Sequence, residues 1–181
     1  MQGKGLDILE ACKKGDIRSQ RIFYDRFKSR IFPMCLRYSN SREDAEDVLQ
    51  EGFIKVFRDL YQYKGNGSLE GWVRKVILNV ALDHLKKQKR TIQTNDLSDK
   101  EYRLRGEDLV FEFEEENASH LIKLMQKLPP GFRTVLNLYV LEGYTHPQIS
   151  EVLGISIGTS KSQLNRAKKF MRSLVEKSLT K

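Results

Sequence analysis

A glycine at position 154 separates two segments with helical apolar periodicity, and this pattern constrains the fold more than any other in the chain. Before it, Ile149, Val152 and Leu153 recur at three- and four-residue steps, as on one face of a helix. Glycine ends a helix well because it takes the left-handed conformation without a side-chain clash. Ser156 can cap the next helix by accepting a backbone N–H. Residues 144–169, YTHPQISEVLGISIGTSKSQLNRAKK, are therefore predicted to form two helices joined by a tight turn.

The second of these helices, predicted over residues 157–168, has a face suited to DNA. Its inward residues are expected to be Ile157, Leu164 and Ala167. The outward residues are polar or basic: Thr159, Lys161, Ser162, Asn165 and Arg166. Arg and Lys bind phosphates or guanine edges, and Ser, Thr and Asn bind bases or backbone. The pattern favours a DNA-binding helix-turn-helix, although a plain helical hairpin with a solvated basic face has the same periodicity.

The charge of the chain falls into three blocks. Residues 1–90 hold 19 Lys and Arg against 12 Asp and Glu, residues 91–117 hold 3 against 9, and residues 118–181 hold 10 against 3. The formal net charge of +8 thus comes from two basic bodies that flank an acidic strip. This division predicts two small domains joined by a flexible acidic linker, and the basic excess favours an acidic partner.

Helical periodicity recurs in both halves and no strand pattern is found, so an all-α fold is expected. One helix is predicted over residues 17–38, with a kink or break near residues 29–32, because Pro33 lacks a backbone N–H. Another, over residues 44–60, carries an unbroken apolar stripe. In the second half, Tyr139 is expected to face inward on a helix over residues 132–141.

The helix over residues 44–60 has a second, narrower face beside its apolar stripe. It consists of Asp47, Gln50, Glu51 and Ile54. An apolar residue among acidic and amide groups suggests a docking face. A solvated acidic face with one stray isoleucine has the same composition, since single exposed apolar residues are common.

The loop over residues 61–71 and the helix that follows it combine aromatic, glycine and basic residues. Glycines let a backbone approach a ligand closely, rings stack on bases, and cations follow the phosphate backbone. This composition favours binding of single-stranded nucleic acid through Tyr63, Asn66, Arg74 and Lys75. The alternative is that Tyr63 simply plugs the end of the core.

The sequence argues against an enzyme and against a metal site. It has no carboxylate cluster with metal spacing, no phosphate-binding glycine loop and no nucleophile–histidine–acid set. The histidines are far apart, and Cys12 and Cys35 form no CxxC pair. No metal, cofactor or small-molecule substrate is therefore expected, and both thiols are expected to be reduced and buried. Without a signal peptide or an apolar run of about 20 residues, the chain is expected to be cytoplasmic.

Two blocks of the sequence resemble known regions of one family. Residues 44–60, DAEDVLQEGFIKVFRDL, and residues 63–90 resemble region two of bacterial sigma factors, and residues 124–171 resemble region four. With these two regions and a short linker, the chain is identified as a member of the ECF (extracytoplasmic function) sigma factors of the sigma-70 family. The resemblance implies a region two domain at residues 1–90, a linker at 91–117 and a region four domain at 118–181.

The resemblance also implies partners and roles. Region two would dock on the RNA polymerase core through the face that contains Asp47, Gln50, Glu51 and Ile54, and would capture the non-template strand of the minus-ten element. Asn79 matches a polar position that lies where the DNA strands part. Region four would bind the core and read the minus-thirty-five element of promoter DNA with its recognition helix. An anti-sigma factor is implied as a further partner.

The recognition helix departs from the family pattern at two positions. Relatives usually read close to GTVKSRLxRA, and this chain reads GTSKSQLNRA, with Ser160 and Gln163 at the usual Val and Arg. Ser160 is expected to weaken a packing contact and Gln163 to remove a phosphate contact. The alternative function is an autonomous helix-turn-helix regulator, which would need a dimer or ligand module in the first 90 residues.

Overall fold

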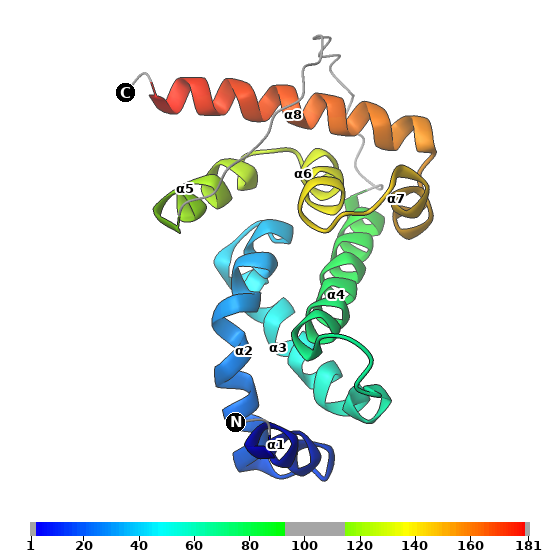
Figure 1. The fold of residues 1–181 in the computed structure, drawn as a ribbon. Helices are drawn as coiled ribbons and strands as arrows, with labels where there is room; N and C mark the ends of the chain where they lie inside the picture. Colours follow the sequence, from blue (N-terminus) through cyan, green and yellow to red (C-terminus); the bar gives the residue numbers. More distant parts are fainter. Residues whose placement is uncertain (1–2, 93–114, 180–181) are drawn as a thin grey trace. The chain divides into compact units, whose positions relative to one another are not determined.

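The structure, a computed structural model, describes residues 3–92 and 115–179 of the 181-residue chain. All regular secondary structure in these described residues is helical (Figure 1). The chain divides into two compact units, Met1–Lys87 and Gln88–Lys181. The prediction of an all-α fold with two helical parts is confirmed. Most of the expected linker lies outside the described residues.

The first unit is built from helices whose starts are marked by capping residues in the sequence. Asp16 accepts a hydrogen bond from the backbone N–H of Ser19 at 2.7 Å, and Ser41 accepts one from the N–H of Asp44 at 3.0 Å. Such caps satisfy donors that have no partner inside the helix. The elements of this part of the chain are α1 (Gly3–Lys13), α2 (Ile17–Tyr38), α3 (Arg42–Asp59), the 3-10 turn η1 (Leu60–Gln62) and α4 (Leu69–Ile92).

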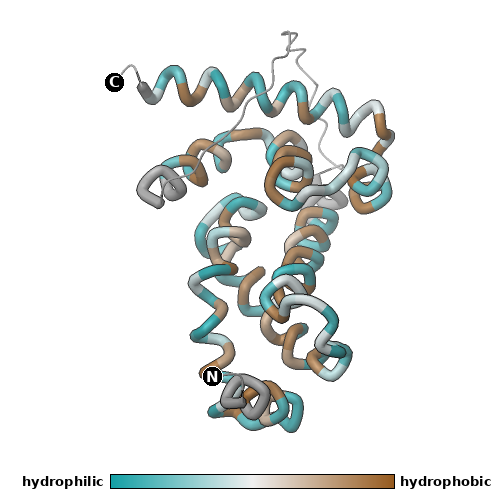
Figure 2. Tube along the Cα trace, in the orientation of Figure 1, coloured by the Kyte–Doolittle hydropathy of each residue, from teal (hydrophilic) through white to brown (hydrophobic). Residues whose placement is uncertain are grey.

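Along each of these helices, hydrophobic positions alternate with hydrophilic ones (Figure 2). The core of the first unit lies between the apolar faces that this alternation creates. Aromatic pairs join α2 to α3: the ring centroids of Phe23 and Phe57 are 5.6 Å apart, and those of Tyr24 and Phe53 are 4.7 Å apart. Edge-on pairs of this kind add to the free energy gained by burial alone. The buried apolar residues of this unit include Phe23, Phe27, Ile31, Met34, Ala45, Val48, Leu49, Phe53, Val56, Leu60, Val73, Ile77, Leu78 and Ala81.

Helices α3 and α4 approach each other closely at Gly52. A Cβ atom added to Gly52 would lie 2.8 Å from Cγ1 and 2.9 Å from Cγ2 of Ile77, well inside the optimal separation of two carbon atoms. Glycine is a poor helix former, by about 1 kcal/mol relative to alanine. Its place in the middle of α3 is explained by this contact with α4.

Of the two outcomes expected near Pro33, a kink or a division of the helix, the division is wrong, because α2 runs undivided from Ile17 to Tyr38. Proline removes only one backbone bond, the one that the carbonyl of Ser29 would accept. Ser29 is exposed, so solvent can satisfy that carbonyl.

The second unit places one long helix, α8, along α5, α6 and α7 (Figure 1). Thr145 begins α7 with a capping box, in which the Gln148 side chain accepts from the backbone N–H of Thr145 at 2.8 Å. Gly154 ends α7 with φ 64°, in the left-handed conformation that the sequence predicts. The elements are α5 (Glu115–Gln126), α6 (Pro130–Leu136), the π-helical turn η2 (Asn137–Leu141), α7 (His146–Leu153) and α8 (Ile157–Leu179).

Two residues of this unit that were expected to face inward are exposed. Tyr139 is 40% exposed and Ile157 is 44% exposed. Tyr139 lies in the π-helical turn, whose wider winding moves residues off the face that an α-helical count assigns to them. Ile157 is the first residue of α8 and precedes Ser160, the first buried residue of that helix.

Both cysteines are buried and unpaired. Burial raises the pKa of the Cys35 thiol to about 12. Burial, followed by the nearby charge of Asp16, also raises the pKa of Cys12. In the part of the chain that the structure describes, His, Cys, Asp and Glu form no group of three that could hold a metal ion. None of the described helices has the length and apolar character needed to cross a membrane.

Candidate functional site

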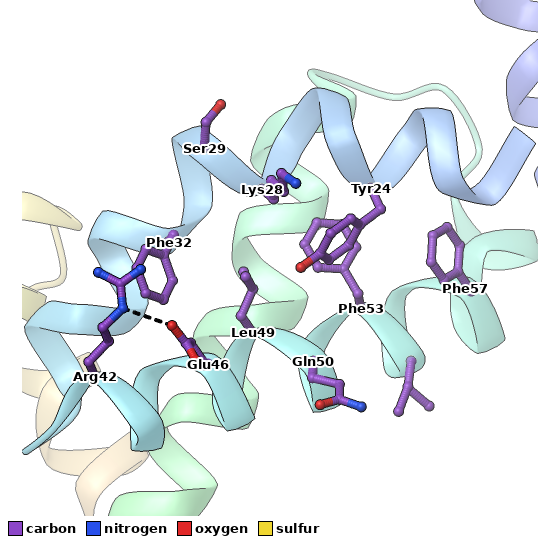
Figure 3. A pocket seen from close by; sticks show the side chains of 11 residues that line it. Tyr24, Lys28, Ser29, Phe32, Arg42, Glu46, Leu49, Gln50, Phe53 and Phe57 are labelled. Carbon is purple, nitrogen blue, oxygen red and sulfur yellow. Dashed lines mark hydrogen bonds and ion pairs between the residues drawn. The ribbon is translucent and has the colours of Figure 1, made fainter.

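A groove of about 750 Å³ opens on the first unit between α2 and α3 (Figure 3). Its walls are mainly aromatic and aliphatic, and charged side chains stand at its edge. Arg42 donates a hydrogen bond to Glu46 at 2.8 Å there. An apolar groove with a few polar groups is typical of a binding site. The lining residues are Tyr24, Lys28, Ser29, Phe32, Arg42, Glu46, Leu49, Gln50, Phe53, Ile54 and Phe57.

The docking face predicted on α3 lies only partly in this groove. Its four residues are all exposed, and Ile54 is 62% exposed. Gln50 and Ile54 line the groove, and Asp47 does not. Glu51 turns toward α4, where its carboxylate lies 2.7 Å from Nε2 of His84. This hydrogen bond joins α3 to α4. It is also the main cause of the lowered pKa of Glu51.

Sequence reasoning missed the contribution of α2 to the groove. Tyr24, Lys28 and Phe32 line it from α2, and the ammonium group of Lys28 lies 5.4 Å from the centroid of the Tyr24 ring. Their spacing of four residues is a helical stripe that the sequence does contain. This stripe adjoins the fully buried one that runs through Phe23 and Phe27, so periodicity alone does not distinguish the two.

The loop before α4 is closed by one of its predicted site residues. The Tyr63 hydroxyl donates a hydrogen bond to the carbonyl of Gly67 at 2.8 Å. Gly65 and Gly67 have φ values of 79° and 86°, a conformation that residues with a side chain rarely adopt. Asn66 lies exposed between them. The loop therefore presents an amide side chain at the tip of a closed turn.

On α4, the predicted residues separate into two groups. Lys75 and Asn79 are exposed and lie four residues apart, so they share a face of the helix. Trp72 precedes them on that side and brings its ring to 5.8 Å from that of Tyr63. Arg74 instead lies near Cys35 of α2, whose thiol is influenced by its charge. The structure thus brings Tyr63, Lys75 and Asn79 to one side and places Arg74 elsewhere.

In the second unit, α7 and α8 form the predicted helix-turn-helix. Ser150 donates a hydrogen bond to the carbonyl of Ile155 across the turn. Ser156 caps α8 by accepting from the N–H of Thr159 at 2.9 Å. Ile149 is fully buried, and Leu164 and Ala167 face inward as expected.

The five predicted DNA-binding residues of α8 differ in how free their side chains are. The hydroxyl of Thr159 lies 2.9 Å from that of Ser156, and Ser162 donates to the carbonyl of Thr159 at 3.0 Å. Lys161 and Asn165 are exposed and Arg166 is half-buried. Within the described residues, these last three side chains make no hydrogen bond or ion pair.

The two unusual positions of α8 both make contacts that the sequence did not predict. Ser160 is fully buried, and its hydroxyl lies 2.9 Å from Nδ1 of His146 in α7. The side chain of Gln163 lies over the start of α6, with its Nε2 atom 3.4 Å from the position of a Cβ on Gly131. Ser160 therefore makes a polar contact with α7, and the Gln163 side chain lies close to the start of α6.

Comparison with known proteins matches both units to family models. Residues 23–91 match "Sigma-70 region 2" and residues 120–171 match "Sigma-70, region 4". The ECF RNA polymerase sigma factor SigE of Mycolicibacterium smegmatis is 31% identical over 151 residues, which cover 82% of this chain and 58% of that protein. The RNA polymerase sigma-H factor of Pseudomonas aeruginosa is 26% identical over 188 residues, which cover 98% and 95% respectively. A solved structure of the sigma factor RpoE with the anti-sigma factor NepR, from Bartonella quintana, is 19% identical with a TM-score of 0.47 and covers 94% of this chain and 93% of that one.

Proposed function

Because this chain belongs to the ECF sigma factors of the sigma-70 family and directs RNA polymerase to promoters, we propose that three of its surfaces divide that work. The observation that carries the assignment is the match of region 2 and region 4 in this order along one chain. The chain acts as a subunit of the polymerase and is not itself an enzyme. An autonomous regulator would need a dimer or ligand module in the first half of the chain. That half instead matches Sigma-70 region 2, which argues against this alternative.

The groove between α2 and α3, with the exposed face of α3, is proposed to dock on the polymerase core. Ile54 offers the apolar contact, and Gln50 and Asp47 offer polar ones beside it. Tyr24 and Phe32 widen the apolar surface. Aromatic residues in a concave surface are typical of the parts of an interface that contribute most to affinity.

The loop at residues 63–67 and the exposed face of α4 are proposed to capture the non-template strand of the minus-ten element. A base must leave the stack before its pairing edge can be read, at a cost of a few kcal/mol. Asn66 has the donor and acceptor for such an edge, and Lys75 can bind the strand's phosphates. Asn79 would lie where the strands part. Since the Tyr63 hydroxyl is bound to Gly67, Tyr63 would form the wall of the base site.

Templates can separate these roles within region two. Tyr63→Ala and Asn79→Ala should both reduce transcription from duplex promoters. A premelted bubble that exposes the minus-ten strand should rescue the Asn79 variant more than the Tyr63 variant, because melting is already done. Full-rate transcription of the duplex by both folded variants would remove the loop as the base site.

Helix α8 is proposed to read the minus-thirty-five element. Lys161, Asn165 and Arg166 have side chains available for DNA, and Thr159 and Ser162 lie beside them with hydroxyls that can also bond a phosphate. If Arg166 reads a guanine, its loss should cost about 1–3 kcal/mol at one base position. An equal loss for all sequences would indicate a phosphate contact.

Two further assignments are part of the proposal. An anti-sigma factor would hold the chain inactive by covering a surface that the polymerase needs, for which the groove is suited. The chain would work in the cytoplasm, where polymerase and promoters meet.

Run-off transcription with purified core polymerase and fragments of the host genome tests the function directly. Specific transcripts should appear only when the chain and the core are both present. In mobility-shift assays, the chain alone should bind duplex DNA weakly and with little sequence preference. Tight and specific binding by the chain alone would instead favour an autonomous regulator.

A further inference from the structure

The helix-turn-helix contains a buried polar pair that joins its two helices. Ser160 of α8 has no exposed surface, and its hydroxyl lies 2.9 Å from Nδ1 of His146, the first residue of α7. A buried hydroxyl without a partner would be costly, so this contact is needed to keep Ser160 inside. A valine side chain of similar size would need no such partner.

His146 is itself held by a third element. Its ring stacks on that of Tyr139 in η2, with centroids 4.6 Å apart and planes inclined by 25°. Burial, and then the charge of Lys161, lower the pKa of His146, which favours the neutral form of its ring. A neutral ring offers one donor and one acceptor, and either polarity suits a serine hydroxyl. The imidazole therefore connects η2, α7 and α8.

This connection lies at the end of α8 where a recognition helix reads bases. Ser156, Ile157 and Gly158 are exposed and Thr159 is half-buried, which makes Ser160 the first buried residue of the helix. The next is Leu164, one turn later. The first turn of α8 therefore lacks a buried apolar side chain of its own.

We propose that His146 is a positioning residue for promoter reading: through Ser160 it fixes the tilt and rotation of the base-reading end of α8, and so sets the preference for the upstream element. This inference rests on the proposed role of α8 in reading DNA. His146 does not need to touch DNA. A hydrogen bond is directional, so the pair holds the helix in one rotation, which a smooth apolar contact does less strictly.

The test uses polymerase holoenzyme and a promoter library with a randomised upstream element. Ser160→Ala removes the hydroxyl, and His146→Phe removes Nδ1 but keeps a ring to stack on Tyr139. Each variant should lower the preference for the best upstream sequence over the average one by about three- to tenfold, the range expected for one hydrogen bond. The double variant should lose little more than either single variant, because both changes break the same contact.

A conservative variant and a control complete the design. His146→Asn places an amide near the position of Nδ1. This variant should therefore keep much of the preference for the best upstream sequence that His146→Phe loses. Lys161→Ala is the control for the proposed function, and should weaken binding to promoters in general. If Lys161→Ala has no effect, α8 is not the DNA reader and the proposed function fails. If Lys161→Ala weakens binding but Ser160→Ala and His146→Phe leave the ranking of upstream sequences unchanged, the positioning role is refuted, whether or not overall binding falls.

Discussion

Replacing Ile54 by alanine should weaken binding to the polymerase core while the fold stays intact. Complete burial of an isoleucine side chain is worth about 1.5–3 kcal/mol. Because Ile54 is 62% exposed in the free protein, a partner that covers it gains about 1–2 kcal/mol. At about 1.4 kcal/mol per tenfold change, the dissociation constant should rise about 5- to 27-fold. Fluorescence anisotropy of an N-terminally labelled chain, titrated with purified core, measures this change.

The chain offers a matched control on the neighbouring helix. Ile22 of α2 is 53% exposed but does not line the groove, so Ile22→Ala should leave the affinity for the core unchanged. Neither change should lower the free energy of unfolding by more than about 0.5 kcal/mol, as for most surface substitutions. The reasoning is refuted if Ile54→Ala binds the core as tightly as the original chain, or if Ile22→Ala loses as much affinity.

Two further substitutions test the packing and capping of the first unit by urea unfolding. Gly52→Ala adds a Cβ against Ile77, and the overpacking should cost about 1–3 kcal/mol. The gain in helix propensity is about 1 kcal/mol, so the net loss of stability should be about 0–2 kcal/mol. Ile77→Val should recover part of this loss, whereas a clear gain in stability on Gly52→Ala would contradict the close contact. Hydrogen bonds from Ser19 hold the pKa of Asp16 below its usual range. The charged cap therefore stabilises the fold at a pH above the pKa that Asp16 has in the unfolded chain. This contribution is lost as the pH falls through the pKa of Asp16 in the folded chain. Relative to Asp16→Asn, the original chain should therefore lose stability below about pH 4, and a pH-independent difference between the two chains would argue against this cap.

The helix-turn-helix could be predicted from the sequence because its signals are local. Gly154 and the cap at Ser156 act on the backbone within a few residues, so no distant part of the chain is needed to interpret them. The same holds for the capping serine at the start of α3. The apolar stripe of α3 was equally readable, since periodicity identifies the side of a helix that is buried.

The parts of the structure that could not be predicted depend on which helices pack against each other. The groove needs α2 beside α3, and periodicity does not say which neighbour a helix packs against. The partner of Ser160 is fourteen residues away in sequence, and nothing in the local pattern joins the two. Tyr139 was misplaced because an α-helical count fails inside a π-helical turn. Composition alone puts Arg74 and Lys75 into one basic group, but adjacent helical residues face different directions.

The burial of both native thiols makes this chain convenient for site-selective chemical labelling. Maleimides and similar reagents attack the thiolate, and with a pKa of about 12 only about one Cys35 side chain in ten thousand is ionised at pH 8. Cys12 is likewise buried and has a raised pKa. A cysteine introduced at an exposed position such as Asn66 would react far faster. A fluorophore or crosslinker could then be placed on the loop without first removing either native cysteine, and could follow its encounter with promoter DNA in real time.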